Sequence, residues 1–186
     1  MQKGHRKAGG AGVKRAKRAK PANPPKPSRP LVGILLGSRS DLAIAEAATA
    51  TLDRLAIPHE LLVASAHRDP DDVRRYARGA ERRGIRVILA VAGLAAALPG
   101  VVASHTSLPV IGVPVPAGPL RGLDALLSMM QLPSGVPVGT VALGETGGRN
   151  GALLAARILA LSDPAIRRRL ARMRASARSG RGRPRR

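Results

Sequence analysis

The sequence predicts an α/β domain in which helices cover both faces of a parallel β-sheet. Short runs of almost purely apolar residues alternate along the chain with segments whose apolar residues recur at helical intervals. Such runs are typical of parallel strands buried on both faces, because the helices that connect them lie on both sides of the sheet. The chain has 186 residues, 44% of them hydrophobic, which suits one domain with a substantial core.

Two βα units open the domain. A strand at 31–36 precedes a helix over 40–55, in which alanine and leucine recur at helical intervals. A second strand at 60–63 precedes a helix whose start is marked by Asp69 as an N-cap carboxylate, by a proline at the first helical position and by two further acids. Gly84 ends this helix.

Three more apolar runs follow, separated by helical segments. We expect the strands at 85–91, 109–113 and 137–143, and the helices near 98–105, 123–130 and 150–161. The sheet therefore has five strands. The segment 165–177 is compatible with a further helix that has an arginine-rich face.

The formal net charge of +21 resides mainly in the two ends of the chain. Residues 1–30 hold ten Lys and Arg and no acid, and residues 161–186 hold ten with one acid. The middle, 31–160, has twelve basic and ten acidic residues and is nearly neutral. The charge therefore describes the two tails and is not a nucleic-acid signature of the domain between them.

We divide the chain into a disordered, basic, proline-rich tail at 1–30, an αβα domain at 31–162, and an arginine-rich C-terminal helix and tail at 163–186. The first tail has too little apolar surface to offset its ordering entropy. It is either a polyanion-binding arm or a solvated extension, and no aromatic residue is interleaved for base stacking. Nucleic acid is thus expected only at the tails. No apolar run follows the charges as in a signal peptide, so we expect a cytoplasmic protein.

Composition excludes several classes of site. The chain has no cysteine, which excludes disulfides, thiol nucleophiles and thiolate metal ligands. Its four histidines are scattered, with no pair at ligand spacing, so we expect no zinc or iron centre. The apolar runs are short and interrupted by Gly, Pro or charge, so no membrane span is expected.

Ligands of a parallel α/β sheet bind outside the carboxyl ends of its strands, and three turns are expected there. The first, Gly37-Ser38-Arg39-Ser40-Asp41, offers hydroxyls and amides to an anion and a carboxylate to ribose hydroxyls. The second, 65–69, sets His67 beside Arg68, and the third is 92–100. Taken alone, each turn also has an explanation without a ligand. The first could be an ordinary capped helix start, the second could hold an ordinary loop histidine, and the small residues of the third could serve close helix packing. Their convergence at one edge favours a site for a small phosphorylated substrate.

Five motifs then occur in a fixed order along the chain. They are Gly37-Ser38-Arg39-Ser40-Asp41, Ser65-Ala66-His67-Arg68, Ala97-Leu98-Pro99-Gly100, Gln131-Leu132-Pro133-Ser134-Gly135-Val136-Pro137-Val138 and Asn150-Gly151-Ala152-Leu153-Leu154-Ala155. The set closely resembles the N5-carboxyaminoimidazole ribonucleotide mutases, purine-pathway enzymes of the aminoimidazole ribonucleotide carboxylase family. The resemblance covers about residues 31–175, and the set is far more specific than any one motif.

The resemblance implies a flavodoxin-like three-layer domain, assembled as a homo-octamer. It also implies an isomerase that moves a carboxylate from the exocyclic nitrogen, N5, to ring carbon 4 of the nucleotide without metal, cofactor or ATP. His67 would be the general acid/base, since an imidazole exchanges a proton near neutral pH. Ser38 and Arg68 would hold the phosphate and Asp41 the ribose. The other substrate-binding residues that it implies are Ser40, Ser65, Ala66, Gly93 and Leu98.

The third loop departs from the family pattern, Gly-Gly-Ala-Ala-His-Leu-Pro-Gly, at two positions. Leu94 stands for the second glycine and Ala97 for the histidine. Leucine narrows the space for the substrate or requires a backbone shift, because the φ freedom of glycine is lost. Three interpretations stay open: the mutase, a sister enzyme that carboxylates aminoimidazole ribonucleotide directly with carbon dioxide, and a catalytically degenerate relative that binds polyanions through its tails.

Overall fold

The computed structural model describes residues 29–179 and, at the start of the chain, Met1 alone. The disordered tail predicted at 1–30 therefore lies almost entirely outside the described residues, as does 180–186 of the arginine-rich end. The division of the chain at 30 and at 162 stays a prediction.

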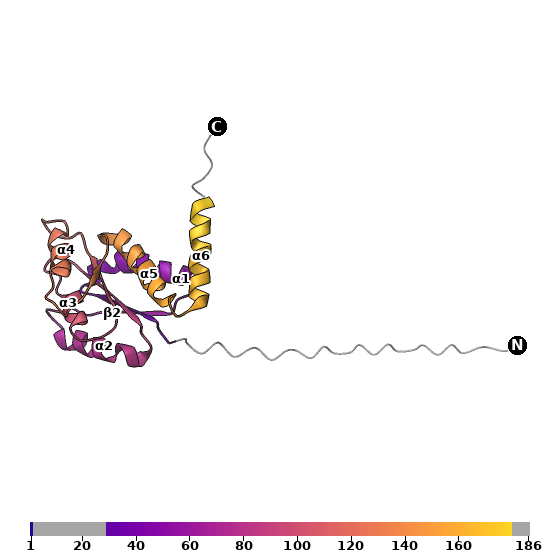
Figure 1. Cartoon of the computed structure of the whole chain (residues 1–186), viewed down its shortest axis with the longest axis horizontal. Coiled ribbons are helices and arrows are strands. Elements are labelled where there is room, and N and C mark those ends of the chain that lie inside the picture. Colours follow the sequence, from indigo (N-terminus) through magenta and orange to yellow (C-terminus); the bar gives the residue numbers. More distant parts are fainter. Residues whose placement is uncertain (2–28, 180–186) are drawn as a thin grey trace, which may run out of the picture.

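Five parallel strands form one sheet, in the order β2-β1-β3-β4-β5. Helices lie on both sides of this sheet (Figure 1). The strands are β1 (Val32–Leu36), β2 (His59–Val63), β3 (Val87–Ala92), β4 (Val110–Pro114) and β5 (Gly139–Thr140). The strand order changes direction at β1, which pairs with β2 on one side and with β3 on the other. This is the flavodoxin-like order, and a crevice forms at the point where the direction changes. The predicted α/β fold with a five-stranded parallel sheet is confirmed.

Helices form the two outer layers. They are α1 (Leu42–Arg54), α2 (Pro70–Arg83), α3 (Leu98–Ala103), α4 (Leu123–Met130), α5 (Gly144–Leu159) and α6 (Pro164–Ser179), with a 3-10 turn, η1 (Arg39–Asp41), before α1. Buried residues of α1 and α5 pack on one face of the sheet, and those of α2, α3 and α4 pack on the other. Within residues 29–179, no helix is long and apolar enough to cross a membrane.

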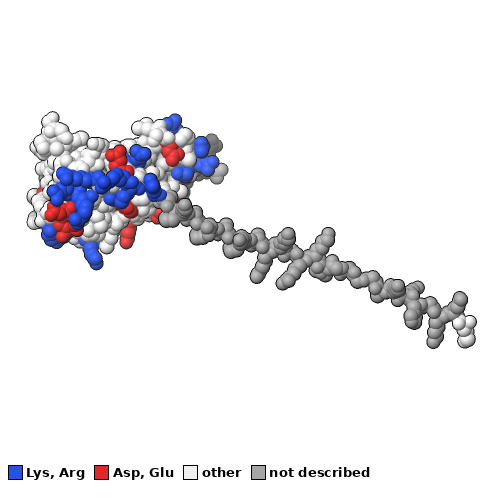
Figure 2. All heavy atoms as spheres, turned by 90° about the horizontal axis from the view of Figure 1, so that it is seen from below, with Lys and Arg blue, Asp and Glu red and all other residues white. Residues whose placement is uncertain are grey.

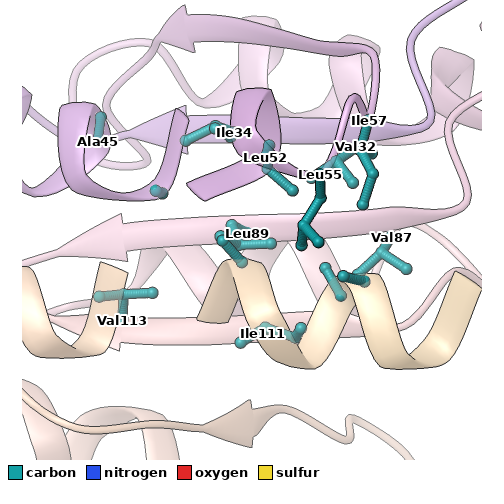
Figure 3. Close-up of a cluster of buried hydrophobic side chains, with 14 of the residues drawn as sticks. Val32, Ile34, Ala45, Leu52, Leu55, Ile57, Val87, Leu89, Ile111 and Val113 are labelled. Carbon is teal, nitrogen blue, oxygen red and sulfur yellow. The ribbon is translucent and has the colours of Figure 1, made fainter. Parts of the chain in front are cut away.

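The core has two halves because side chains alternate along each strand. Val87, Leu89 and Val91 of β3 point to α1 and α5, and their neighbours Ile88 and Ala90 point to the opposite layer. Figure 3 shows the first half, in which side chains of β1 and β3 lie beside those of α1, and Ile111 and Val113 of β4 lie beside α5. Helix α6 joins this half through its buried residues Ile166 and Leu170, so the start of α6 packs against the core of the domain.

The structure corrects two element boundaries. The strand expected at 137–143 contains only Gly139 and Thr140, because it is an edge strand beside β4 and Pro137 cannot donate to a ladder. The helix expected over 150–161 begins earlier, at Gly144. Its first two turns are rich in glycine, which lowers helix propensity, but close packing requires these residues. A Cβ at Gly148 would overlap the carbonyl oxygen of Ile44 on α1.

Close approach also explains Gly33, in the middle of β1. A Cβ at this position would overlap the hydroxyl oxygen of the buried residue Tyr76 on α2. We expect Gly33→Ala to lower the free energy of unfolding by about 2 kcal/mol, a typical cost of overpacking. Tyr76→Phe should reduce that cost, because it removes the overlapping oxygen, and a double-mutant cycle followed by urea denaturation measures the coupling.

Gly139→Ala is the matched control, since its added Cβ meets only the carbonyl oxygen of Val110 at 3.8 Å. The proposed contact would be contradicted if Gly33→Ala lowered the free energy of unfolding by the same amount in the wild-type protein and in the Tyr76→Phe variant.

Candidate functional site

The carboxyl ends of β1, β2 and β3 surround a cavity of about 440 Å³. The loops that follow these three strands form most of its lining. All nine site residues expected from the sequence are among the lining residues: Ser38, Ser40, Asp41, Ser65, Ala66, His67, Arg68, Gly93 and Leu98. The structure therefore brings the three turns together, as the topology of the sheet requires.

Hydroxyl groups dominate the first loop. The Oγ of Ser38 accepts a hydrogen bond from the backbone N–H of Ser40 at 3.3 Å and so caps η1. The hydroxyl of Ser40 lies 2.9 Å from the Oγ of Ser38 and 2.9 Å from Oδ1 of Asp41. One hydroxyl hydrogen cannot serve both oxygens, so the three side chains form a small network with donor and acceptor capacity left for a ligand.

Asp41 is a buried carboxyl at the floor of this loop. It is 8% exposed, and no ion pair among the described residues includes it. Burial raises the pKa of Asp41, and the hydrogen bond from Ser40 opposes this effect. A carboxylate in this position favours a ligand that brings hydrogen-bond donors, such as a pair of ribose hydroxyls.

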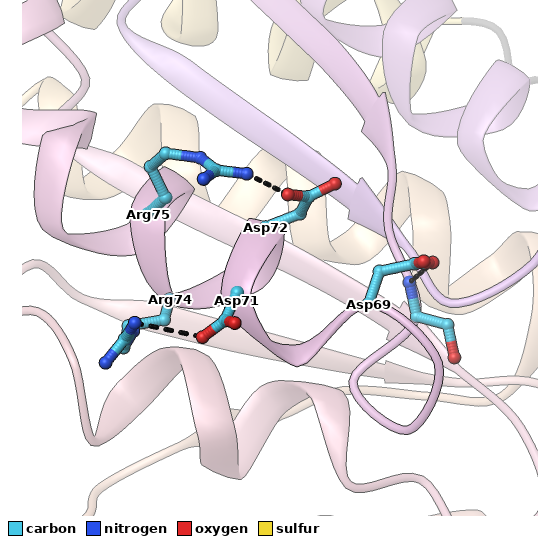
Figure 4. A network of polar contacts seen from close by, with 6 residues as sticks. Asp69, Asp71, Asp72, Arg74 and Arg75 are labelled. Atoms are coloured by element: carbon cyan, nitrogen blue, oxygen red, sulfur yellow. Dashed lines mark hydrogen bonds and ion pairs between the residues drawn. The ribbon is translucent and has the colours of Figure 1, made fainter.

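The second loop is closed by Ser65 and Asp69. The N–H of Asp69 donates to the carbonyl oxygen of Ser65 at 2.8 Å, and the N–H of Ser65 donates to the Asp69 carboxylate at 3.4 Å. Figure 4 shows this carboxylate turned away from α2. The predicted capping of α2 by the side chain of Asp69 is therefore wrong, because this carboxylate makes no cap hydrogen bond and instead holds the loop.

His67 and Arg68 lie between these two anchors and are exposed at the mouth of the cavity. The N–H of Arg68 donates to the Oγ of Ser65 at 3.3 Å. Its Nη2 donates to the carbonyl oxygen of Gly37 at 3.2 Å, which ties the second loop to the first. The guanidinium is thereby held beside Ser38, with most of its five N–H donors free to bind an anion.

The third loop approaches the loop after β4 closely. A Cβ at Gly93 would come within 3.1 Å of the Cβ of Val115, so only glycine fits there without displacement. Leu94 takes the backbone conformation that glycine would favour, with φ at 54°, and its side chain is 52% exposed. Leu94 thus keeps a glycine-like backbone, so the backbone shift that was one of the two expected consequences of leucine is absent, and its side chain occupies space beside the cavity. Ala97 and the buried residue Leu98 complete this wall at the start of α3.

Sequence reasoning missed one lining residue. Ala117, from the loop after β4, also faces the cavity. The signal was available, since the carboxyl end of β4 lies at the same edge of the sheet as the other three. Its small, apolar side chain carries no chemistry that a sequence motif would mark.

The charge around the cavity is sparse. Seen from the side of α2, blue side chains form a band across the molecule (Figure 2), and α2 itself carries five arginines. None of these five lines the cavity, where Arg68 is the one Lys or Arg side chain and Asp41 the one carboxylate among the lining residues. In the described part of the chain, no three His, Asp or Glu side chains are grouped as metal ligands would be. The lining thus suits a small ligand that carries one anionic group, bound by Arg68, and polar groups elsewhere.

Comparisons with known proteins identify a family that matches most of the chain. The family model described as AIR carboxylase matches residues 31–179. Three N5-carboxyaminoimidazole ribonucleotide mutases are similar over about three-quarters of the chain. That of Pyrococcus horikoshii is 52% identical over 77% of this chain and 80% of its own. That of Mycobacterium tuberculosis H37Rv is 53% identical over 76% and 80%. That of Bacillus subtilis is 52% identical over 76% and 87%.

The fold is similar to that of a solved structure as well. The crystal structure of Treponema denticola PurE superimposes with a TM-score of 0.72 and 32% identity, and the match covers 81% of this chain and 94% of that one. The family model, the relatives and the solved structure agree, and each matches three-quarters of the chain or more. The chain belongs to the AIR carboxylase family.

Proposed function

We propose that this protein is an N5-carboxyaminoimidazole ribonucleotide mutase, an isomerase of purine nucleotide synthesis. The observation that carries the proposal is the cavity at the carboxyl ends of β1, β2 and β3, lined by every residue that the family motifs assign to substrate. The sequence identity of about 50% to each of three mutases, over about three-quarters of this chain, supports the same activity.

In this proposal the first two loops hold the phosphate and ribose of the substrate. Arg68 offers a charge-assisted fork to the phosphate, and the hydroxyls of Ser38 and Ser40 lie beside it. The carboxylate of Asp41 accepts hydrogen bonds from the ribose hydroxyls, which would add donors to the one that the Ser40 hydroxyl supplies to this buried group. Ser65, Ala66, Gly93 and Leu98 shape the remaining wall.

His67 would move one proton in each half of the reaction. The bond from N5 to the carboxylate carbon breaks, carbon dioxide leaves, and N5 takes a proton from the imidazolium. Carbon 4 of the ring then attacks the retained carbon dioxide, and the neutral imidazole removes the proton from carbon 4. The protein ends in its starting protonation state. Enclosure near carbon 4 keeps the carbon dioxide at a high effective concentration.

A parallel assay tests the function directly. The purified protein is supplied either with N5-carboxyaminoimidazole ribonucleotide or with aminoimidazole ribonucleotide plus bicarbonate, and formation of the 4-carboxy product is followed. Turnover of the first substrate alone supports the mutase. Turnover of the second alone identifies the direct carboxylase, and inactivity with both favours the degenerate relative.

His67→Asn should lower turnover by at least about 100-fold while nucleotide binding changes little, because the amide cannot exchange the proton but keeps polar contact. Turnover and product binding, the latter by calorimetry, are measured on the same samples. His105→Asn is the matched control, since His105 lies outside the cavity, in the loop before β4. Equal losses of binding and turnover in His67→Asn would make His67 a structural residue.

The buried carboxyl of Asp41 gives stability a pH dependence of definite sign. Burial raises the pKa of Asp41 above its usual value of 3.8, so the folded protein holds this proton more tightly than the unfolded chain does. The contribution of Asp41 to the free energy of unfolding is thus greatest below pH 3.8 and decreases as pH rises through the raised pKa.

Asp41→Asn should lack this decrease. The urea midpoint of the variant, measured relative to wild type, is therefore expected to rise between about pH 4 and pH 7. The same variant should bind nucleotide about tenfold more weakly, because a neutral amide is a poorer acceptor for ribose hydroxyls than a carboxylate. A difference in midpoint that stays constant with pH would contradict burial as the dominant influence.

We also infer that the protein acts as a homo-octamer in the cytoplasm. Four large apolar side chains are 45–62% exposed along one side of α4 and the turn before it: Leu120, Leu123, Leu127 and Met130. An apolar stripe of this kind is typical of a surface that another subunit covers. A mass about eight times the 19.3 kDa of one chain is expected by light scattering.

Leu127→Glu should lower this mass, because it would bury a charge in the contact, whereas Ser107→Glu, at an exposed position before β4, should not. A wild-type protein that is monomeric would contradict the assembly.

Polyanion binding through the tails is tested separately by deleting residues 2–28 and 180–186. Helix α6 is kept in this design because Ile166 and Leu170 are buried in the core.

A further inference from the structure

Leu94 combines two local features that are each unfavourable. Its φ of 54° lies in the left-handed region, which leucine adopts at a cost because of its Cβ. Its apolar side chain is also 52% exposed. Among the described residues, Ala56 and Arg121 are the other non-glycine residues with positive φ, and neither of them lines the cavity. Backbone strain that persists at a ligand site is a reason to look for a role in binding.

The surroundings hold Leu94 in this conformation. The N–H of Ala96 donates to the carbonyl oxygen of Leu94 at 2.8 Å, which closes the turn. On the other side, Cδ2 of Leu94 would lie 2.6 Å from a Cβ added at Gly118, so the side chain reaches the loop after β4. Gly118 also has a positive φ, at 67°. The isobutyl group thus spans the two loops on the same side of the cavity.

The lining of the cavity is divided by polarity. The first and second loops contribute the hydroxyls, the carboxylate, the imidazole and the guanidinium, whereas 94–98 and Ala117 contribute only apolar side chains. Leu94 is the one large apolar side chain that stays exposed in this wall, because Leu98 is 2% exposed. In the proposed function the polar loops hold the phosphate and the ribose, which would turn the base toward the third loop.

Among the apolar side chains of the lining, no other is both large and exposed. Tyr76 is the only aromatic residue of the chain, and it is buried between α2 and the sheet. The other apolar lining side chains of the third loop, apart from Leu98, are alanines. An apolar contact with the face of a base therefore has one available partner, the side chain of Leu94.

We propose that Leu94 is a specificity-determining residue whose side chain packs against the face of the five-membered base of the bound nucleotide. Binding would cover apolar surface that the free protein exposes, and this gain offsets the local cost of the left-handed leucine. The inference rests on the proposed function, since it takes the base from that substrate. It adds a contact that the glycine of the family pattern could not make.

Two substitutions test the contact without distorting the loop. Leu94→Gly and Leu94→Asn both remove the isobutyl group and put a residue that tolerates positive φ in its place. Ala56→Gly is the matched control, because it relieves the same conformation at the end of α1, away from the cavity. The probes are aminoimidazole ribonucleotide and ribose 5-phosphate, which lacks the base, and urea midpoints are measured for every variant.

Both variants at position 94 should bind aminoimidazole ribonucleotide about tenfold more weakly than wild type, because apolar burial against the ring is lost. Their affinity for ribose 5-phosphate and their urea midpoints should not fall. Ala56→Gly should leave both affinities unchanged.

Three results would overturn the inference. Equal losses of affinity for both probes would mean that position 94 acts through the shape of the loops. Unchanged or tighter binding of aminoimidazole ribonucleotide would mean that leucine makes no useful contact with the base. A wild-type protein that binds ribose 5-phosphate but gains nothing from the base, and turns over neither substrate, would refute the proposed function together with the contact. Under the second result, turnover by the wild-type protein would show that only the contact is refuted and that the proposed function stands.

Discussion

Parallel pairing of β1 with both β2 and β3 fixes the geometry of the cavity, because it holds three strand ends at one level. Leu36 is in register with Val63 on one side and with Val91 on the other. The ladders continue one residue further, through hydrogen bonds from Gly37 to Val91 and from Ala64 to Leu36. Ser38, Ser65 and Gly93 follow within two residues of these bonds. Loops that are distant in the sequence therefore leave the sheet side by side, and they need no long connection to meet.

A second constraint places the first loop. Helix α1 packs closely on α5, and a glycine at 148 is needed because the backbone of Ile44 lies where a side chain would be. The start of α1 is continuous with η1, so this packing also positions Asp41 below the cavity. That carboxyl is buried there, and burial raises its pKa. The packing of two helices therefore helps to place a titratable group at the cavity.

The sequence was informative wherever one residue type can satisfy a local requirement. Apolar runs located four of the five strands, and Gly84, with φ at 104°, ends α2 as expected. Prediction from the sequence failed where tertiary contacts determine the local structure. Glycine has a low helix propensity, yet Gly147 and Gly148 lie in α5, where an added Cβ would overlap the carbonyl oxygens of Ala142 and Ile44, respectively. The carboxylate of Asp69 could cap a helix or close a loop, and sequence alone cannot choose between these partners.

The same distinction applies to the site. The order of the motifs along the chain predicted that nine residues meet at one cavity. It did not predict how exposed each of these side chains would be. Asp41 and Ser65 are nearly covered, whereas His67 and Arg68 are exposed at the mouth. In the proposed reaction this asymmetry has a consequence, because carbon dioxide must be kept beside His67 while water is excluded. A single chain covers the ribose end of the cavity and leaves the imidazole open. The bound nucleotide and a neighbouring subunit would have to supply the rest of the enclosure, so catalysis and assembly would depend on each other.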